Sequence, residues 1–302
     1  MFLALMLGAS YTLTEVALEG FDPVTLVLVR LIIGAVFIAL WMRARSQPLP
    51  SGGAVLRLLV IIGLLNTIGS FLLITWGQEY VTASYTAILV ASNAIFAAIG
   101  ATLVLPSERL TIRRGVGVLV GFVGVVFLFV DQLGWSNGEH HGLLSVLGAL
   151  AILGGAIGLA IVALTVRSKL PSLLPAQLAF PMLITGVVSV ALFEGVLLIS
   201  GDVHARAAPR PGPILAAAVL GLLNAGIGNV VYYTLIRAWG VTRTALVGYV
   251  VPMIGVALGV GLLHDELGPA MIVGLVFILA SLVFVNPATT PVAATSLPDV
   301  EA

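Results

Sequence analysis

Polar side chains that could bind a small solute recur inside the most apolar segments of the chain. The tetrapeptide GLLN occurs at residues 63–66 and again at 221–224, so Asn66 and Asn224 stand 158 residues apart. An amide both donates and accepts hydrogen bonds without carrying a charge, which suits a neutral or zwitterionic ligand. The same amide can instead bind a neighbouring membrane helix, at about 1 kcal/mol. Both interpretations stay open for each asparagine, and the pairing of the two favours a shared pocket.

Further polar or helix-breaking residues fall at a similar depth in their apolar runs, among them Asn93 and Pro252. A proline inside a helix leaves the carbonyl four residues earlier without a donor. Such backbone is tolerated within a membrane only where it faces protein or a water-filled cavity. A lone Ser or Tyr, by contrast, more often satisfies a local carbonyl. The predicted substrate-binding residues are Tyr11, Asn66, Ser70, Ser92, Asn93, Asn224, Tyr249 and Pro252.

Three ionisable residues lie within apolar runs: Arg30, Glu15 and Glu194. Charges at such depth are costly and often functional. Arg30 needs a partner, and Glu15 or Glu194 could supply one. We expect an ion pair or a snorkelled charge that holds helices together, in preference to direct contact with substrate. The predicted midplane has no Asp, Glu, His or Lys, so it offers no carrier for a proton relay or a carboxylate sodium site.

Catalytic and metal-binding patterns are not expected. The chain has no cysteine, and the adjacent pair His140-His141 lies in a predicted loop where it is expected to be solvated. An intramembrane enzyme would need paired bases or a nucleophile with its base at depth. We therefore expect no enzyme, no cofactor and no metal. The functions left open are transport, a channel and a sensory scaffold. The formal net charge of +0 does not indicate a nucleic-acid partner.

Long apolar runs must position these residues. Hydrophobic residues make up 60% of the chain and charged residues 9%, with a mean hydropathy of +1.18, whereas soluble domains carry about 25% charged residues. A membrane helix needs about 20 apolar residues. The sequence therefore predicts an all-α polytopic membrane protein with ten transmembrane helices, near 1–18, 23–42, 55–76, 82–105, 113–130, 143–166, 175–199, 212–236, 242–263 and 269–285.

The distribution of Lys and Arg predicts the orientation, because short cytoplasmic loops hold the positive charge. Ten of the basic residues fall in or beside alternate connections, and Arg206 and Arg210 fall in the opposite set. Both termini are therefore predicted to be cytoplasmic. The basic residues of the predicted cytoplasmic side are Arg43, Arg45, Arg57, Arg109, Arg113, Arg114, Arg167, Lys169, Arg237 and Arg243.

An internal repeat organises the ten runs. The segment 23–40 matches 175–192 at eight of eighteen positions, and the two GLLN motifs fit the same duplication. We predict a first five-helix repeat at 1–130, a periplasmic linker at 131–142, a second repeat at 143–285 and a disordered cytoplasmic tail at 286–302. An odd number of spans per copy inverts the second copy relative to the first, which is typical of transporters that rock around a central site.

Two segments carry a resemblance to a known family. GFDPVTLVLVRLIIGAVFIAL, with Pro23 and Arg30, and YVVPMIGVALGVGLLHDELGPAMIVGLVFILASLVFV, with Pro252 and Glu266, resemble the EamA-type ten-helix exporters of the drug/metabolite transporter superfamily. The resemblance covers nearly the whole chain. It departs from the family at Asn93-Ala94, where a proline is usual.

The resemblance implies export of small metabolites across a bacterial inner membrane by alternating access through a central cavity. The chain is most similar to the bacterial exporters of aromatic and other hydrophobic amino acids. Its expected partners are a small neutral or zwitterionic substrate and membrane lipid, with a monomer expected and a dimer as the alternative. Efflux of drugs, nucleosides or other metabolites by the same fold is the alternative function.

Overall fold

A computed structural model describes residues 2–104, 111–132, 142–200, 210–235 and 247–285. Within these ranges the chain forms helices and their connections, and no strand. The predicted tail at 286–302, the residues 133–141 of the predicted linker, with His140 and His141, and the side chain of Tyr249 lie outside the described part.

The first half of the chain contains five helical runs, two of which are interrupted. Here η denotes a π-helical segment, in which the backbone hydrogen bonds span five residues instead of four. The third run is α3, η1 and α4 in direct succession, and the fourth is α5 and α6. The elements are α1 (Phe2–Leu18), α2 (Pro23–Ala44), α3 (Gly53–Asn66), η1 (Thr67–Leu72), α4 (Leu73–Gly77), α5 (Ala83–Ala91), α6 (Asn93–Val104) and α7 (Ile112–Gln132).

The second half repeats this order. Its third run again contains a π segment, η2, after which the helix continues to Leu235. The elements are α8 (Leu143–Lys169), α9 (Pro175–Ser200), α10 (Pro211–Val219), η2 (Leu220–Gly228), α12 (Val247–Leu258), η3 (Gly259–Leu263) and α13 (Pro269–Val285).

Among the described residues, six helices are long and apolar enough to cross a membrane. The other apolar helices are shorter, so the count of ten spans remains a prediction. Large apolar side chains are exposed along these helices, for example Leu103, Ile112 and Ile199. Such a surface suits lipid, because contiguous apolar exposure on this scale is rare in water-soluble monomers. The six are Pro23–Ala44, Gly53–Gly77, Ala83–Val104, Leu143–Lys169, Pro175–Ser200 and Pro211–Leu235.

Prolines begin several of these helices. Pro23, Pro175, Pro211 and Pro269 are each the first residue of α2, α9, α10 and α13, a position where the missing N–H costs nothing and the fixed φ favours the helix. Asp22 caps α2, since its Oδ1 accepts hydrogen bonds from the backbone N–H groups of the second and third residues of the helix at 3.0 Å each.

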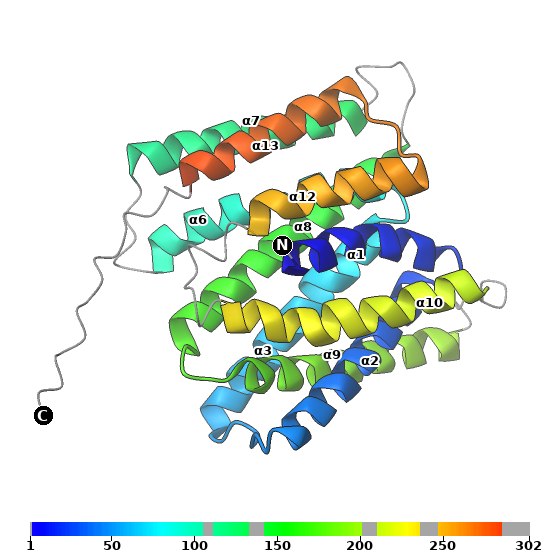
Figure 1. The fold of residues 1–302 in the computed structure, drawn as a ribbon, viewed down its shortest axis with the longest axis vertical. Coiled ribbons are helices and arrows are strands. Elements are labelled where there is room, and N and C mark those ends of the chain that lie inside the picture. Colours follow the sequence, from blue (N-terminus) through cyan, green and yellow to red (C-terminus); the bar gives the residue numbers. More distant parts are fainter. Residues whose placement is uncertain (1, 105–110, 133–141, 201–209, 236–246, 286–302) are drawn as a thin grey trace, which may run out of the picture.

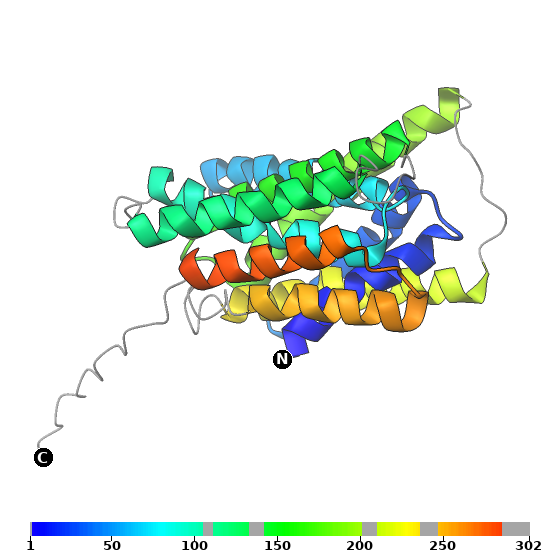
Figure 2. The same cartoon turned by 90° about the horizontal axis from the view of Figure 1, so that it is seen from above.

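Several contacts between helices have a counterpart between the equivalent helices of the other half (Figures 1 and 2). The equivalent helices α2 and α9, α5 and α12, and α7 and α13 touch one another directly. The contact of α1 with α12 has its counterpart in α8 with α6, and that of α2 with η2 has its counterpart in α9 with α3. Likewise α1 with η2 matches α8 with η1. This pattern is the one that a two-fold relation between the halves produces.

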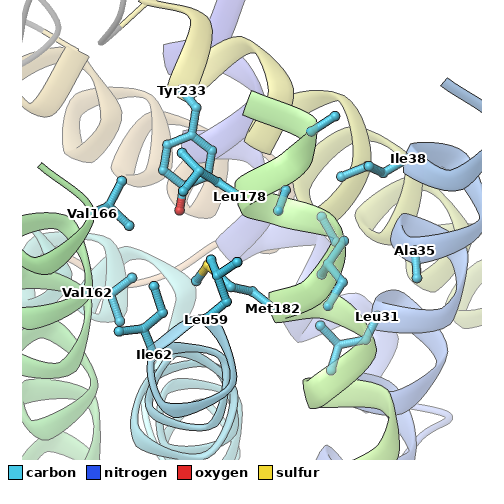
Figure 3. Close-up of a cluster of buried hydrophobic side chains, with 14 of the residues drawn as sticks. Leu31, Ala35, Ile38, Leu59, Ile62, Val162, Val166, Leu178, Met182 and Tyr233 are labelled. Atoms are coloured by element: carbon cyan, nitrogen blue, oxygen red, sulfur yellow. The ribbon is translucent and has the colours of Figure 1, made fainter. Parts of the chain in front are cut away.

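The largest buried cluster lies where helices of both halves meet (Figure 3). Apolar side chains of α2, α3, α8 and α9 converge there with the ring of Tyr233. Because lipid is as apolar as these side chains, the cluster stabilises the bundle through van der Waals packing between helices. The cluster therefore anchors α2, from which Arg30 projects. Its members labelled in Figure 3 are Leu31, Ala35, Ile38, Leu59, Ile62, Val162, Val166, Leu178, Met182 and Tyr233.

Candidate substrate site at the paired π segments

Both GLLN motifs lie at a π segment. Asn66 is the last residue of α3, directly before η1, and Asn224 lies within η2. After the shift of 158 residues, the two π segments overlap at 67–70 and 225–228. Such segments are rare and occur frequently at functional sites. The repeat thus places the same backbone irregularity next to the same amide in both halves.

Glycines let α2 lie directly against η2. A Cβ added at Gly221 would come within 2.7 Å of Ile33 and 3.1 Å of the Arg30 carbonyl. One added at Gly34 would come within 2.7 Å of Ala225. Larger residues at these positions would force the two helices apart. The close approach carries the Arg30 side chain to the centre of the third run of the second half.

Arg30 lies between the two π segments. Its Nη2 donates a 2.9 Å hydrogen bond to Asn224 Oδ1 in η2, and its guanidinium carbon lies 4.6 Å from the centre of the Phe71 ring in η1. The residue is 5% exposed, and within the described chain its Nε has no hydrogen-bond partner. The two GLLN-bearing segments are therefore linked by a single buried cation.

The expected ion pair of Arg30 with Glu15 or Glu194 is wrong. The Glu15 carboxylate accepts the backbone N–H of Ala83 at 2.5 Å, and Glu194 Oε1 lies 2.6 Å from the Thr25 hydroxyl. Glu15 and Glu194 therefore contact groups near the first residues of α5 and α2. The guanidinium of Arg30 instead contacts the amide of Asn224 and the ring of Phe71.

These neutral contacts compensate Arg30 only in part. Burying an ion costs several kcal/mol. A hydrogen bond to a charged group contributes about 1.5–3 kcal/mol, and a desolvated cation–π contact about 2 kcal/mol. Because neither supplies a negative charge, no residue in the described part of the chain neutralises the guanidinium.

Two further predicted residues offer polar groups that the described chain leaves unused. The Tyr11 hydroxyl and the Asn66 amide make no hydrogen bond to another described residue, and both side chains keep partial solvent exposure. Tyr11 lies within electrostatic range of Arg30, and its carbonyl accepts a 3.1 Å hydrogen bond from Gln78. Asn66 precedes Phe71 by five residues on the same helical run. These groups are available to a ligand.

Ser70 and Ser92 satisfy local backbone. Ser92 donates to the Leu89 carbonyl at 2.6 Å and is fully buried. Ser70 is also fully buried, and it faces α8, where a Cβ added at Gly158 would come within 2.5 Å of its hydroxyl. Packing between helices is the simpler role for both.

Asn93 and Pro252 lie at neighbouring places when the two halves are aligned. The chain turns at Ser92 between α5 and α6, and Asn93 begins α6 with a half-buried side chain. The equivalent position lies in α12, which contains the buried Pro252. The predicted run at 82–105 agrees with the span Ala83–Val104, in which Ser92 is a one-residue turn with right-handed helical backbone angles. Tyr249 belongs to α12, with its side chain outside the described part.

Carboxylates gather at one end of the bundle. Glu15 and Asp265 accept the first two N–H groups of α5, from Ala83 and Ser84, at 2.5 and 2.9 Å. Anions are favourable at a helix N-terminus. Beside Glu15 lies an open depression of about 370 Å³, also lined by Glu19 and Glu79 among others. In the described residues no group of three or more His, Asp or Glu side chains is arranged to hold a metal.

Sequence reasoning missed the roles of Phe71 and Asp265. Phe71 carries no polar group, and only its place on the run after GLLN associates it with the site. Asp265 is an acid in the connection before α13, and its hydrogen bond with Ser84 joins residues 181 positions apart. A repeat-based alignment does not reveal such a contact, because the equivalent residue in the first half is Ser107.

The fold and this site define a multi-pass membrane transporter. A family model described as "EamA-like transporter family" matches residues 1–130 and 146–286, so the chain belongs to that family. It is 24% identical over 288 residues to "Uncharacterized transporter YvbV" of Bacillus subtilis (strain 168), covering 94% of this chain and 89% of the relative.

Two other comparisons agree. "Uncharacterized transporter YoaV" of the same organism is 21% identical over 285 residues, covering 94% of each chain. A solved structure described as "Crystal structure of protein" has the same fold, with a TM-score of 0.62 at 17% identity, over 94% of this chain and 97% of the other.

Proposed function

We propose that this transporter exports small zwitterionic metabolites, with aromatic and other hydrophobic amino acids as the substrate class, by alternating access through a central site. The proposal covers the substrate class, the direction and the mechanism, beyond membership of the family. The site comprises Asn66 and Asn224 with the groups around Arg30.

The single observation that carries the proposal is the pairing of the two π segments at equivalent places in the repeat. Each segment adjoins an asparagine of the GLLN motif, and the Asn66 amide has no partner in the described chain. The Asn66 side chain is partly exposed, so its amide is open to a ligand. A hydrogen bond to the transported solute would explain why position 66 has an amide side chain.

Alternating access is supported by the helix contacts, because contacts in one half have counterparts between the equivalent helices of the other half. A two-fold related bundle has two equivalent arrangements, in which one half takes the position that the other half held. Ser92 is a turn between α5 and α6, and Pro252 lies inside the equivalent helix α12. A proline within a helix is a common place for the helix to bend.

The charge of the site argues against the main alternative within transport. Efflux of lipophilic cations requires a buried anion near the substrate. Arg30 instead places a positive charge between η1 and η2, and a second cation close to it is disfavoured electrostatically.

Counterflow in proteoliposomes tests the proposal. Vesicles preloaded with an unlabelled amino acid should accumulate the labelled amino acid faster than empty vesicles and should saturate with concentration. A panel of amino acids, nucleosides and cationic drugs distinguishes the substrate classes. If no amino acid exchanges above the vesicle background, the substrate class is wrong, and conductance without saturation would favour a channel.

A further inference from the structure

We propose that Arg30 is a carboxylate-binding group, so that the transported solute is held by its anionic end between η1 and η2. This inference rests on the proposed function in one respect, since it assigns a ligand contact within the same site. From the sequence alone, Arg30 is expected to form an ion pair that holds helices together. In this inference Arg30 instead selects substrates that carry a negative group.

The first support is the absence of a counter-charge. Glu15 and Glu194 are engaged with Ala83 and Thr25 respectively, and Arg30 forms no ion pair within the described ranges. Its polar contact is the neutral oxygen of Asn224 at 2.9 Å. A guanidinium that is 5% exposed in a membrane protein would bind an anion more strongly than the same group in water.

The second support is an excess of hydrogen-bond donors. Arg30 Nε–H points to no acceptor in the described chain, and the Tyr11 hydroxyl, within electrostatic range of Arg30, is likewise unused. A carboxylate offers two oxygens that accept hydrogen bonds on several lone pairs. Arginine matches that geometry with two parallel N–H groups. A region with spare donors and one neutral acceptor is suited to such an anion.

The third support is the position of Arg30 across the two halves. The residue belongs to the first repeat and binds Asn224 of the second. A carboxylate that binds the guanidinium competes with Asn224 Oδ1 for the same donors. Ligand binding at this point would therefore weaken a contact between the halves, which links occupancy of the site to relative movement of α2 and η2.

A binding measurement on purified protein in lipid nanodiscs tests the inference without requiring transport. The probes are matched pairs that differ at the carboxylate: phenylacetate against phenylacetamide, and L-phenylalanine against L-phenylalaninamide. We expect each acid to bind about tenfold or more tightly than its amide, as expected for a charge-assisted pair. Equal binding of acid and amide would overturn the inference.

Two variants localise the preference. Arg30→Gln should remove the preference for the acid, and Asn224→Asp should remove it as well by providing a built-in anion at the 2.9 Å contact. Asn224→Asp should also raise the melting temperature, which guards against the case in which Arg30→Gln fails to fold. The matched control is Arg45→Gln, because Arg45 also stacks on a ring, that of Trp41 at 4.8 Å, but is exposed.

The outcomes separate this inference from the proposed function. Preference for acids that persists in Asn224→Asp or Arg30→Gln refutes the role of Arg30. Counterflow of amino acids with equal transport of their amides leaves the export proposal standing and refutes the carboxylate contact. Arg30-dependent binding of phenylacetate without any counterflow of amino acids supports the carboxylate contact and refutes the export proposal. Failure of every carboxylate to bind the native protein also refutes it.

Discussion

Asp265 Oδ2 accepts a 2.9 Å hydrogen bond from the backbone N–H of Ser84, so a residue of the second half caps a helix of the first. Glu15 accepts the preceding N–H, from Ala83, and the Thr82 hydroxyl accepts that of Tyr85 at 3.3 Å. The first turn of α5 is thus satisfied from three separate segments. This arrangement ties α1, α5 and the residues after η3 together at one end of the bundle.

Gly259→Ala should destabilise the protein by about 1–3 kcal/mol, because an added methyl group overpacks this end. Its Cβ would overlap the Ser84 hydroxyl and approach Asp265 Oδ2 to 2.5 Å. Thermal unfolding in detergent provides the measurement. The control is Gly261→Ala in the same π segment, where the added Cβ has no neighbour within 4 Å. Equal melting temperatures for the two variants would contradict the packing described for η3.

Substitution of the two GLLN asparagines should give opposite results. Asn224→Ala removes the hydrogen-bond acceptor of Arg30 and should cost about 1.5–3 kcal/mol of stability. Asn66→Ala removes an amide without a partner in the described chain and should leave the free energy of unfolding within about 0.5 kcal/mol of native. If Asn66 contacts substrate, as we propose, Asn66→Ala should lower the rate of counterflow while the stability of the protein stays native. Unchanged counterflow would remove Asn66 from the site.

Glu194→Gln should be at least as stable as the native protein. The Thr25 hydroxyl lies 2.6 Å from Glu194 Oε1 and 2.5 Å from Asp22 Oδ2, and its single proton can serve one of these contacts. An amide N–H at position 194 would supply the other. The comparison is a double-mutant cycle with Thr25→Val, in which the benefit of the glutamine should disappear. A benefit that survives Thr25→Val would show that the glutamine acts elsewhere.

Single cysteines should report the predicted orientation directly, because the native chain contains none. Ser46→Cys lies in the connection after α2, on the side predicted to be cytoplasmic, and Glu19→Cys lies after α1, on the opposite side. Both positions are exposed. In intact cells a membrane-impermeant maleimide should label position 19 alone, and position 46 should react after permeabilisation. The reversed pattern would invert the topology.

The sequence predicted the helical runs well because their signals are local. An apolar stretch bounded by Asp22-Pro23 or by Gly268-Pro269 specifies a helix and its start from neighbouring residues alone. The repeat extended this success to the pairing of helices, since two copies that resemble one another also contact one another equivalently. The one-residue turn at Ser92 inside the span Ala83–Val104 is a finer detail, and no proline or glycine marks it in the sequence.

The surroundings of Arg30 could not be predicted in the same way. The expectation of a carboxylate partner followed from charge alone, whereas the contact joins residues 194 positions apart and uses an amide. Its geometry depends on Gly34 and Gly221, which set how closely α2 approaches η2. Such a distance emerges from the packing of whole helices, and a linear pattern of residue types does not contain it.

The paired π segments also bear on the ancestry of the chain. A widened turn of this kind is rare, and here it overlaps at 67–70 and 225–228 once the copies are aligned. One ancient insertion passed to both copies is a simpler history than two separate events at matching sites. On that history the widened turn is older than the duplication that produced the two halves.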